Sequence, residues 1–232
     1  MKFGIIVFSR FDSQRLPGKA LIDLAGRPLL GRVLDRVRLL SDIAEITVAT
    51  SDQVQDQPIV DYCKSEGVLT FRGHLHDVAQ RALDCAVHFG FTHFARVCGD
   101  RPFLDPGLIS EYWDRMIALD ADLVSNSPCR SFPPGLTTEI VRTEALENSL
   151  SCTDDSSDRE HVTRYFYAHR DRFNIVEMGT SIDWKDVFLA IDTQKDVERA
   201  CYIFDRIGAH PEEAPLSEIA QFARQWETLK RS

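Results

Sequence analysis

The feature that most constrains this chain is the alternation of short apolar runs with helix-like segments over residues 3–125. Apolar runs that indicate strands occur at residues 3–8, 46–49, 68–71, 94–98 and 123–125. Segments with helical spacing or a helix-ending glycine separate them, at residues 28–40, 59–66, 78–89 and 106–119. Strands and helices that alternate in this way form βαβ units. We therefore predict an α/β fold with a doubly wound, mostly parallel sheet, whose ligands bind beyond the carboxyl ends of the strands.

The pattern changes after residue 125, where a small α+β insertion is predicted. Residues 127–135 contain three prolines and predict a loop, and the polar residues 154–158 predict a mobile one. Strands are expected at residues 136–141, 174–178 and 187–191, and helices at residues 160–169, from Thr193 onward and at residues 216–229. The chain has 232 residues, which is the length of one large domain covering residues 1–232.

Composition and charge argue against several classes of protein. The net charge of −9 argues against a general nucleic-acid-binding protein. No apolar run approaches the roughly 20 residues that a membrane span needs, and the first run is too short for a signal peptide. The six cysteines have no Cys-x-x-Cys spacing, so neither a zinc site nor a disulfide framework is expected. We expect a cytoplasmic protein whose partners include neither nucleic acid nor a membrane.

Positive charge is concentrated near the N-terminus, in part within the loop at residues 9–19. Residues 1–40 hold eight basic and three acidic side chains, although the whole chain is acidic. A solvated helix face explains some of these arginines, but it does not explain Arg10, Arg15 and Lys19. Gly18 lets the backbone approach a ligand closely, and arginine and lysine bind phosphate well. The loop lacks the spacing of a Walker P-loop, and it predicts a site for a small, highly charged anion such as a triphosphate.

The spacing within this loop is itself a motif. Arg10, Ser13 and Arg15, followed by Leu-Pro-Gly-Lys, form the run R-x-x-S-x-R-L-P-G-K. The run resembles the signature loop of the cytidylyltransferases that activate acidic sugars such as 3-deoxy-manno-octulosonate and neuraminate, most closely their spore-coat-polysaccharide SpsF-like branch. The resemblance extends over residues 2 to about 206, and it implies the Rossmann-like, GT-A-like fold of nucleotide-diphospho-sugar transferases. It also implies that CTP is bound by Arg10, Ser13, Arg15, Gly18 and Lys19, of which Arg15 and Lys19 are catalytic.

Two aspartates are candidate metal ligands. Asp100 follows a glycine just past the fourth predicted strand, and Mg²⁺ prefers one or two carboxylates together with phosphate oxygens and water. In the resembled family, the aspartates of the G-D-x-P and I-D-T-x-x-D segments bind the metal. This implies Mg²⁺ as cofactor, with Asp100 and Asp192 as its catalytic ligands, whereas Asp196 is explained as a helix-capping residue. Arg101 departs from the small or acidic residue usual in the family, and we expect it to contact phosphate or substrate.

A third segment resembles the family's F-x-G-x-x-x-D-V-x-x-R pattern, which lies near the cytosine and ribose. The resemblance implies nucleotide-binding roles for Gly73, Asp77 and Arg81, with Gly73 making room for the base. His74 and His76 lie in the same segment. Without a third ligand nearby in the sequence, they do not predict a metal site.

Two further matches, P-G-L-x-x-E and R-E-H-V-T, imply a pocket for the acceptor sugar. They contain Glu139, Arg159 and His161. Glu139 and His161 would orient the attacking hydroxyl group, and Arg159 would meet a sugar carboxylate. A cluster of charges at a helix start is the alternative explanation for these residues. By analogy with the family, residues from about 127 to 180 form a substrate-binding and dimerisation subregion, and the protein is a homodimer.

The function implied by the resemblance is transfer of CMP from CTP to a small acidic sugar, nonulosonate- or ulosonate-like, with release of pyrophosphate. Such products serve surface polysaccharide or glycan biosynthesis. The nearest alternative is a nucleotidyltransferase that uses another nucleoside triphosphate. A GT-A-type glycosyltransferase would use an Asp-x-Asp motif, which Asp120-Ala-Asp122 matches. The third alternative is a non-catalytic nucleotide-sugar-binding protein, and the presence of both Asp100 and Asp192 argues against it.

Overall fold

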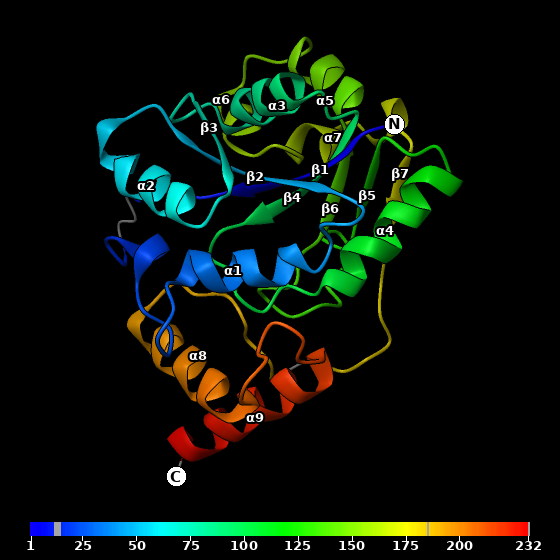
Figure 1. The fold of residues 1–232 in the computed structure, drawn as a ribbon. Coiled ribbons are helices and arrows are strands. Elements are labelled where there is room, and N and C mark those ends of the chain that lie inside the picture. Colours follow the sequence, from blue (N-terminus) through cyan, green and yellow to red (C-terminus); the bar gives the residue numbers. More distant parts are fainter. Residues whose placement is uncertain (12–14, 185, 232) are drawn as a thin grey trace.

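A seven-stranded sheet organises the computed structural model, which describes residues 1–11, 15–184 and 186–231 (Figure 1). Its strands are β1 (Phe3–Phe8), β2 (Glu45–Ser51), β3 (Leu69–Gly73), β4 (His93–Cys98), β5 (Leu123–Ser125), β6 (Glu139–Arg142) and β7 (Ile175–Glu177). They lie in the order β3-β2-β1-β4-β6-β5-β7. Neighbouring strands are parallel except where β6 pairs with β4 and β5. The predicted α/β class with a mostly parallel sheet is therefore confirmed.

Helices cover both faces of the sheet because its central strands are apolar on both sides. Along β1, Ile5 and Val7 point to one face and Ile6 to the other, and all three are fully buried. The first face packs against α1 (Leu29–Arg38), α2 (Gln57–Ser65) and α4 (Pro106–Ala118). The second face packs against α3 (Val78–Phe89), α5 (Thr143–Leu150) and α7 (Arg164–Ala168). Figure 1 shows α3, α5 and α7 above the sheet and α1 and α4 below it.

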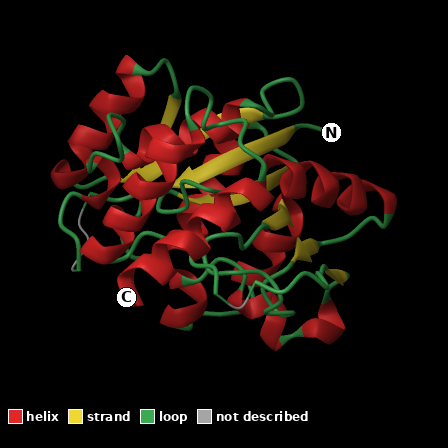
Figure 2. Cartoon of the chain, turned by 90° about the horizontal axis from the view of Figure 1, so that it is seen from below, coloured by secondary structure: helices red, strands yellow, loops and turns green. Residues whose placement is uncertain are grey.

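A third layer, formed by α8 (Gln194–Ile207) and α9 (Leu216–Arg231), lies beyond α1 (Figure 1). In the view from below, helices surround the strands of the sheet (Figure 2). Thr193 and Asp196 form a capping box at the start of α8, as predicted. Side chains of both helices pack around Phe103, Leu136 and Leu189 in a core of their own. This core anchors the segment that leads into Asp192.

Residues 187–191 run beside loops and do not form the predicted strand. The Leu189 N–H donates to the Pro134 carbonyl at 2.8 Å, and the Ile191 N–H donates to the Asp100 carbonyl at 3.1 Å. Because the acceptors are single loop carbonyls, no ladder forms along these residues. The second bond ties the residue before Asp192 directly to Asp100.

The helix predicted at residues 160–169 is broken in two. The helix α6 (Ser156–Glu160) begins inside the segment predicted to be a mobile loop, because Asp155 caps it by accepting from the backbone N–H groups of its first turn. The bend between α6 and α7 contains His161. Short 3-10 turns are η1 (Lys19–Leu21), η2 (Val54–Asp56) and η3 (Arg170–Arg172). Within the described ranges, no helix is long and apolar enough to cross a membrane.

Candidate active site

A cavity of 760 Å³ opens at the carboxyl edge of the sheet, where β1 and β4 end. Its volume lies in the upper part of the range of roughly 300–1,000 Å³ that small-molecule sites occupy. The charged side chains that line it are Arg10, Arg15, Lys19, Arg81, Arg96, Asp100, Glu160 and Asp192, and His76 and His161 also line it. The edge at which an α/β sheet binds ligands is therefore rich in cations in this protein.

The loop after β1 presents Lys19 to this cavity. Gly18 has a φ of 69°, in the left-handed region that favours glycine, and its N–H donates to the Phe11 carbonyl at 3.2 Å. This turn leads into η1, whose first residue is Lys19. Arg10 and Arg15 line the cavity from the same loop, and the predicted phosphate contact Ser13 lies outside the described residues.

The Lys19 ammonium group lies between the two predicted metal ligands. Its Nζ is 2.8 Å from Asp100 Oδ2 and 3.3 Å from Asp192 Oδ1, and it donates to the Ile191 carbonyl at 2.9 Å. Arg15 Nη2 is 3.2 Å from the same Asp192 oxygen. The fold thus brings together two carboxylates that are far apart in the sequence, and both face one cationic atom.

This pair of carboxylates fits a divalent cation. Two carboxylates that face a common point, with room beside them for phosphate oxygens and water, are a donor set that Mg²⁺ prefers. Among the residues that the structure describes, no group of three or more His, Cys, Asp or Glu side chains is arranged to hold a metal. A metal held by Asp100 and Asp192 would therefore take its other ligands from substrate and solvent.

Arg81 lines the cavity from α3 and is almost fully buried, with 1% of its surface exposed. Its Nη1 donates to the carbonyls of His74 (2.6 Å) and Leu75 (3.3 Å), and its Nε has no hydrogen-bond partner in the described chain. Burial, and to a smaller extent the charge of Arg10, lowers the pKa of Arg81 to about 10. Because this Nε is itself buried, Arg81 offers the cavity its positive charge and not a free donor.

The other residues of the predicted base-binding segment have structural partners. A Cβ atom on Gly73 would lie 2.9 Å from Arg81 Cγ, so the glycine makes room for this arginine. Asp77 caps α3 by accepting a backbone N–H bond of 2.8 Å. His74 Nδ1 accepts from the backbone N–H groups of His76 and Asp77. Neither Gly73 nor Asp77 lines the cavity, and both support the position of Arg81.

Of the three residues expected in an acceptor pocket, His161 lines the cavity, whereas Glu139 and Arg159 do not. Glu139 opens β6 and is directly opposite Arg96 on β4, with only 2% of its surface exposed. Arg159 contacts Asp77 at 3.4 Å and donates to two backbone carbonyls, so it joins α6 to α3. Glu139 lies on the same face of the sheet as Arg96, where its carboxylate is covered by hydrogen bonds from Thr163 and Tyr167. Arg159 extends from α6 to Asp77, at the start of α3. The structure thus places both behind the cavity wall.

Arg96 lines the cavity, although the sequence analysis gave it no role. Its Nη1 is 2.5 Å from Glu139 Oε2, and Glu139 Oε1 accepts from Thr163 Oγ1 (2.8 Å) and the Tyr167 hydroxyl group (2.7 Å). Burial alone would raise the pKa of Glu139, but Arg96 and these hydrogen bonds lower it below its usual value. The detectable sign in the sequence is an arginine in the middle of a mostly apolar strand, since a charge there needs a buried partner.

A second cavity, of 520 Å³, adjoins the first at the two aspartates. Asp100 and Asp192 line both cavities, and the proline-containing loop at residues 127–135 forms a wall of the second. Arg101 lines this second cavity, and its Nη1 donates to the Thr137 carbonyl at 2.7 Å. The predicted substrate contacts Arg101 and His161 therefore belong to different cavities.

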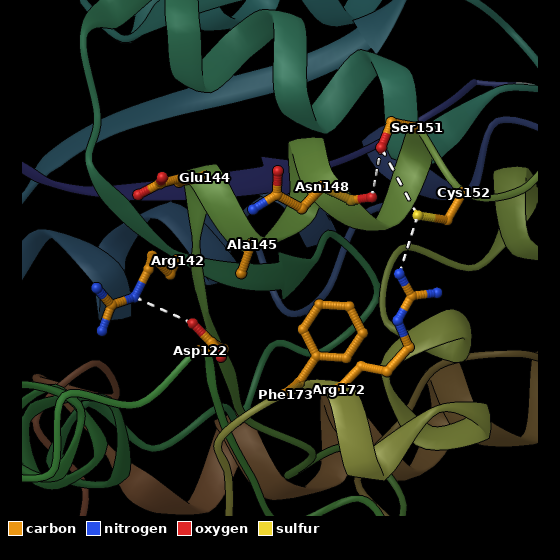
Figure 3. A pocket seen from close by; sticks show the side chains of 9 residues that line it. All are labelled: Asp122, Arg142, Glu144, Ala145, Asn148, Ser151, Cys152, Arg172 and Phe173. Carbon is orange, nitrogen blue, oxygen red and sulfur yellow. Dashed lines mark hydrogen bonds and ion pairs between the residues drawn. The ribbon is translucent and has the colours of Figure 1, made fainter.

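The Asp-x-Asp string lies at the opposite edge of the sheet. Asp122 directly precedes β5, and β5 and β4 run in the same direction because both are antiparallel to β6. Arg142 is 2.5 Å from Asp120 Oδ1 and 3.3 Å from Asp122 Oδ1. Figure 3 shows Arg142 facing Asp122 in a separate pocket. Because both carboxylates have a basic partner far from the ligand edge, the string does not support a glycosyltransferase site.

Comparison with known proteins identifies the class to which this fold and site belong. The model of the cytidylyltransferase family matches residues 4–224, and the chain belongs to this family. It is 29% identical to the spore coat polysaccharide biosynthesis protein SpsF of Bacillus subtilis, over 89% of this chain and 88% of that protein. It is 33% identical to a 3-deoxy-manno-octulosonate cytidylyltransferase of Coxiella burnetii, over 72% of this chain and 63% of that protein. A cytidylyltransferase structure from Leptospira borgpetersenii superposes with a TM-score of 0.92 and 26% identity, covering 99% of this chain and 96% of that one.

Proposed function

We propose that this protein transfers the CMP group of CTP to a hydroxyl group of an acidic sugar and releases pyrophosphate, with Mg²⁺ as cofactor. The observation that supports this most directly is the position of Lys19 between Asp100 and Asp192, where the two cavities meet. A cation from the basic loop and two carboxylates from distant segments share one point there. Such a set suits nucleotidyl transfer, which depends on placing charges around phosphate more than on covalent catalysis.

In this proposal the triphosphate of CTP binds along the loop wall. Arg10, Arg15 and Lys19 neutralise the β- and γ-phosphates and stabilise pyrophosphate as it leaves. Arg81 lines the cavity beside this loop and adds its positive charge to the nucleotide site. His161 lies on the same cavity and orients the attacking hydroxyl group.

Asp100 and Asp192 are the residues that would hold Mg²⁺, which when bound supplies charge neutralisation at the α-phosphate. Lys19 Nζ is now the shared partner of both carboxylates. The phosphate oxygens of an incoming nucleotide are negatively charged, as the two carboxylates are, and they can accept hydrogen bonds from this ammonium group instead. We infer that Lys19 exchanges carboxylate for phosphate when CTP binds, and thereby frees both aspartates.

The test is a panel of nucleotides and acceptors in which pyrophosphate release is measured. CTP, UTP, GTP and ATP are each offered with Mg²⁺ and with 3-deoxy-manno-octulosonate, N-acetylneuraminate or a neutral hexose. We expect release with CTP and an acid alone. Release with another nucleotide would mean that this nucleotide, and not CTP, is the substrate. Full activity in the presence of EDTA would contradict the proposed role of Mg²⁺. Tight CTP binding by calorimetry without turnover on any acid would instead indicate a binding protein.

We also propose the homodimer that the family analogy suggests, with residues from about 127 to 180 at the interface. Light scattering on the purified protein measures its mass in solution. We expect twice the chain mass of 26.4 kDa, and a monomer mass at micromolar concentration would contradict the proposal.

A further inference from the structure

We propose that Arg96 binds the acidic group of the acceptor sugar and that buried Glu139 is the residue that positions it. The inference rests on the proposed function and adds to it the side chain responsible for preferring an acidic acceptor. It also replaces the expectation that Arg159 meets the sugar carboxylate, since Arg159 lies behind the cavity wall.

Arg96 is placed where an acceptor has to lie. It is on β4, the strand that leads to Asp100, and it faces the same cavity as Glu160 and His161. The basic loop follows β1, on one side of β4, and Glu139 of β6 lies on the other side. A nucleotide whose phosphates lie along the loop thus leaves the β6 side of the cavity to a second molecule. Arg96 is the arginine of that side.

The guanidinium group of Arg96 has donors to spare. Glu139 engages Nη1, and Nε is buried without a hydrogen-bond partner in the described residues, so a ligand has to use the donors that remain. An arginine carries five N–H donors in one plane, and its forked geometry matches a carboxylate. Its side chain keeps 21% of its surface exposed, so a ligand in the cavity can reach it. The group is charged, only partly satisfied and accessible from the cavity.

Glu139 fixes the position of Arg96 and leaves some of its N–H donors for a ligand. Three partners fix the carboxylate of Glu139, namely Arg96, Thr163 and Tyr167, and the Tyr167 hydroxyl group also lies 2.7 Å from Ser125 Oγ. Arg96 is on β4, Thr163 directly precedes α7, Tyr167 is on α7 and Ser125 is on β5. The network therefore joins three elements around Glu139. A charge fixed before the substrate arrives needs little reorganisation to bind it, which favours selectivity.

The other arginines of the two cavities suit this task less well. Arg10 and Arg15 are in the phosphate loop, and Arg15 keeps 68% of its side chain exposed. Arg81 donates to two backbone carbonyls on the side of α3. Arg101 and Arg130 line the second cavity, which also reaches Asp100 and Asp192. Arg101 is the more serious competitor, because it follows Asp100 directly and is the less exposed of the two.

The experiment compares an acid with its neutral isostere. Wild type, Arg96→Gln, Arg101→Gln and Glu139→Gln are each titrated with 3-deoxy-manno-octulosonate, N-acetylneuraminate and their carboxamides, in the presence of a non-hydrolysable CTP analogue. Pyrophosphate release with CTP gives the kinetic constants in parallel. Losing a charged hydrogen bond typically costs about 10- to 100-fold, so we expect Arg96→Gln to weaken binding of the acid by about that factor while the carboxamide changes less than about threefold.

Two further readouts separate a positioning role from a merely structural one. Glu139→Gln should raise the KM for the acid more than it lowers kcat, and the KM for CTP should stay within about threefold of wild type. The effects of Arg96→Gln and Glu139→Gln should be non-additive, because the two side chains act as one unit. Arg142→Gln is the matched control, since Arg142 ends β6 at the far edge of the sheet and should leave the preference for the acid unchanged.

Several outcomes would overturn the inference. If Arg101→Gln removes the preference for the acid and Arg96→Gln keeps it, the acceptor is recognised in the second cavity. If Arg96→Gln instead weakens CTP binding and leaves the acid preference intact, Arg96 is a nucleotide contact and the proposed function still stands. If the wild-type protein turns over neutral sugars as well as acids, the inference is contradicted, whereas the proposed nucleotidyltransferase activity stands. A wild-type protein that binds neither CTP nor any acid overturns both proposals.

Discussion

The two edges of the sheet use the same residue types in opposite ways. At the amino edge, Arg142 contacts Asp120 and Asp122 and also donates to the Ala121 carbonyl, so its charge is fully matched within the protein. At the carboxyl edge, one ammonium group, that of Lys19, is shared by two carboxylates. In both places one basic group is shared by two carboxylates, but only the group at the carboxyl edge lies where an α/β sheet binds its ligands.

This difference shows how a site is distinguished from a structural cluster of charges. The amino-edge pocket in Figure 3 contains arginines and acids, as the active-site cavity does. There, however, Arg172 contacts Cys152 and Tyr165 while Arg142 contacts its two aspartates. At the carboxyl edge, Nε of both Arg81 and Arg96 has no partner in the described chain. Both nitrogen atoms are buried, so the place of the charges at the ligand-binding edge, and not their number, separates the two regions.

The largest effect that would test the comparison is expected for Asp100→Asn. The amide keeps the shape of the side chain and removes the charge that faces the proposed metal. We expect kcat to fall by about 10⁴-fold, because metal-assisted charge stabilisation is worth several kcal/mol. Pyrophosphate release at saturating CTP and Mg²⁺ measures it, with Asp122→Asn at the amino edge as the matched control. Equal activity of wild type and Asp100→Asn would show that the carboxyl-edge charges are structural as well.

The next effect is expected for Lys19→Met, which removes the shared ammonium group. We expect kcat/KM for CTP to fall by about 10³-fold, as for loss of one strong donor to a developing charge. The same change leaves two facing carboxylates without their cation, so the nucleotide-free protein should bind Mn²⁺ more tightly than wild type. Electron paramagnetic resonance of free Mn²⁺ measures this binding. Unchanged Mn²⁺ affinity would show that Lys19 and the metal do not compete for one place.

The sequence was sufficient for the class of fold and for the main elements of the site. Strand and helix periodicity predicted the βαβ order, and the family resemblance pointed to Lys19, Asp100 and Asp192, which the structure brings together. The roles of these residues stay predictions until they are tested. Side-chain direction was the part that the sequence could not supply. Motif spacing identified Glu139 and Arg159 but could not show that both have partners within the protein, Glu139 with Arg96 and Arg159 with Asp77.

Long-range partners were missed for the same reason. Asp56 is 2% exposed and accepts from the Phe11 N–H at 2.7 Å, so it fixes the base of the phosphate loop from another segment. In the sequence it is an unremarkable acid near a helix start. The helix α5 was also missed, because its few apolar residues become a core face only when β6 places them against α3. Contacts between distant segments decide both features, and local patterns do not encode them.

The smallest effect concerns stability at the amino edge and should leave catalysis untouched. His93 is 6% exposed at the start of β4, and burial together with the charge of Arg142 lowers its pKa to about 4 from a usual value of 6.5. Between these two values the unfolded chain binds a proton at His93 that the folded chain does not. The free energy of unfolding therefore falls as the pH drops from about 6.5 to 4, by at most about 3 kcal/mol.

Urea denaturation of wild type and His93→Gln across pH 4 to 8 measures this linkage. Above pH 6.5 the stability difference between the two proteins should be constant, and below it the wild type should lose stability that the variant keeps. CTP-dependent pyrophosphate release at pH 7.5 should differ by less than about twofold, because His93 lies at the opposite edge from Lys19. A parallel pH dependence in both proteins would mean that His93 is not the titrating group. A loss of turnover in His93→Gln would show that the two edges are coupled. In that case the charges at the amino edge could not be treated as purely structural.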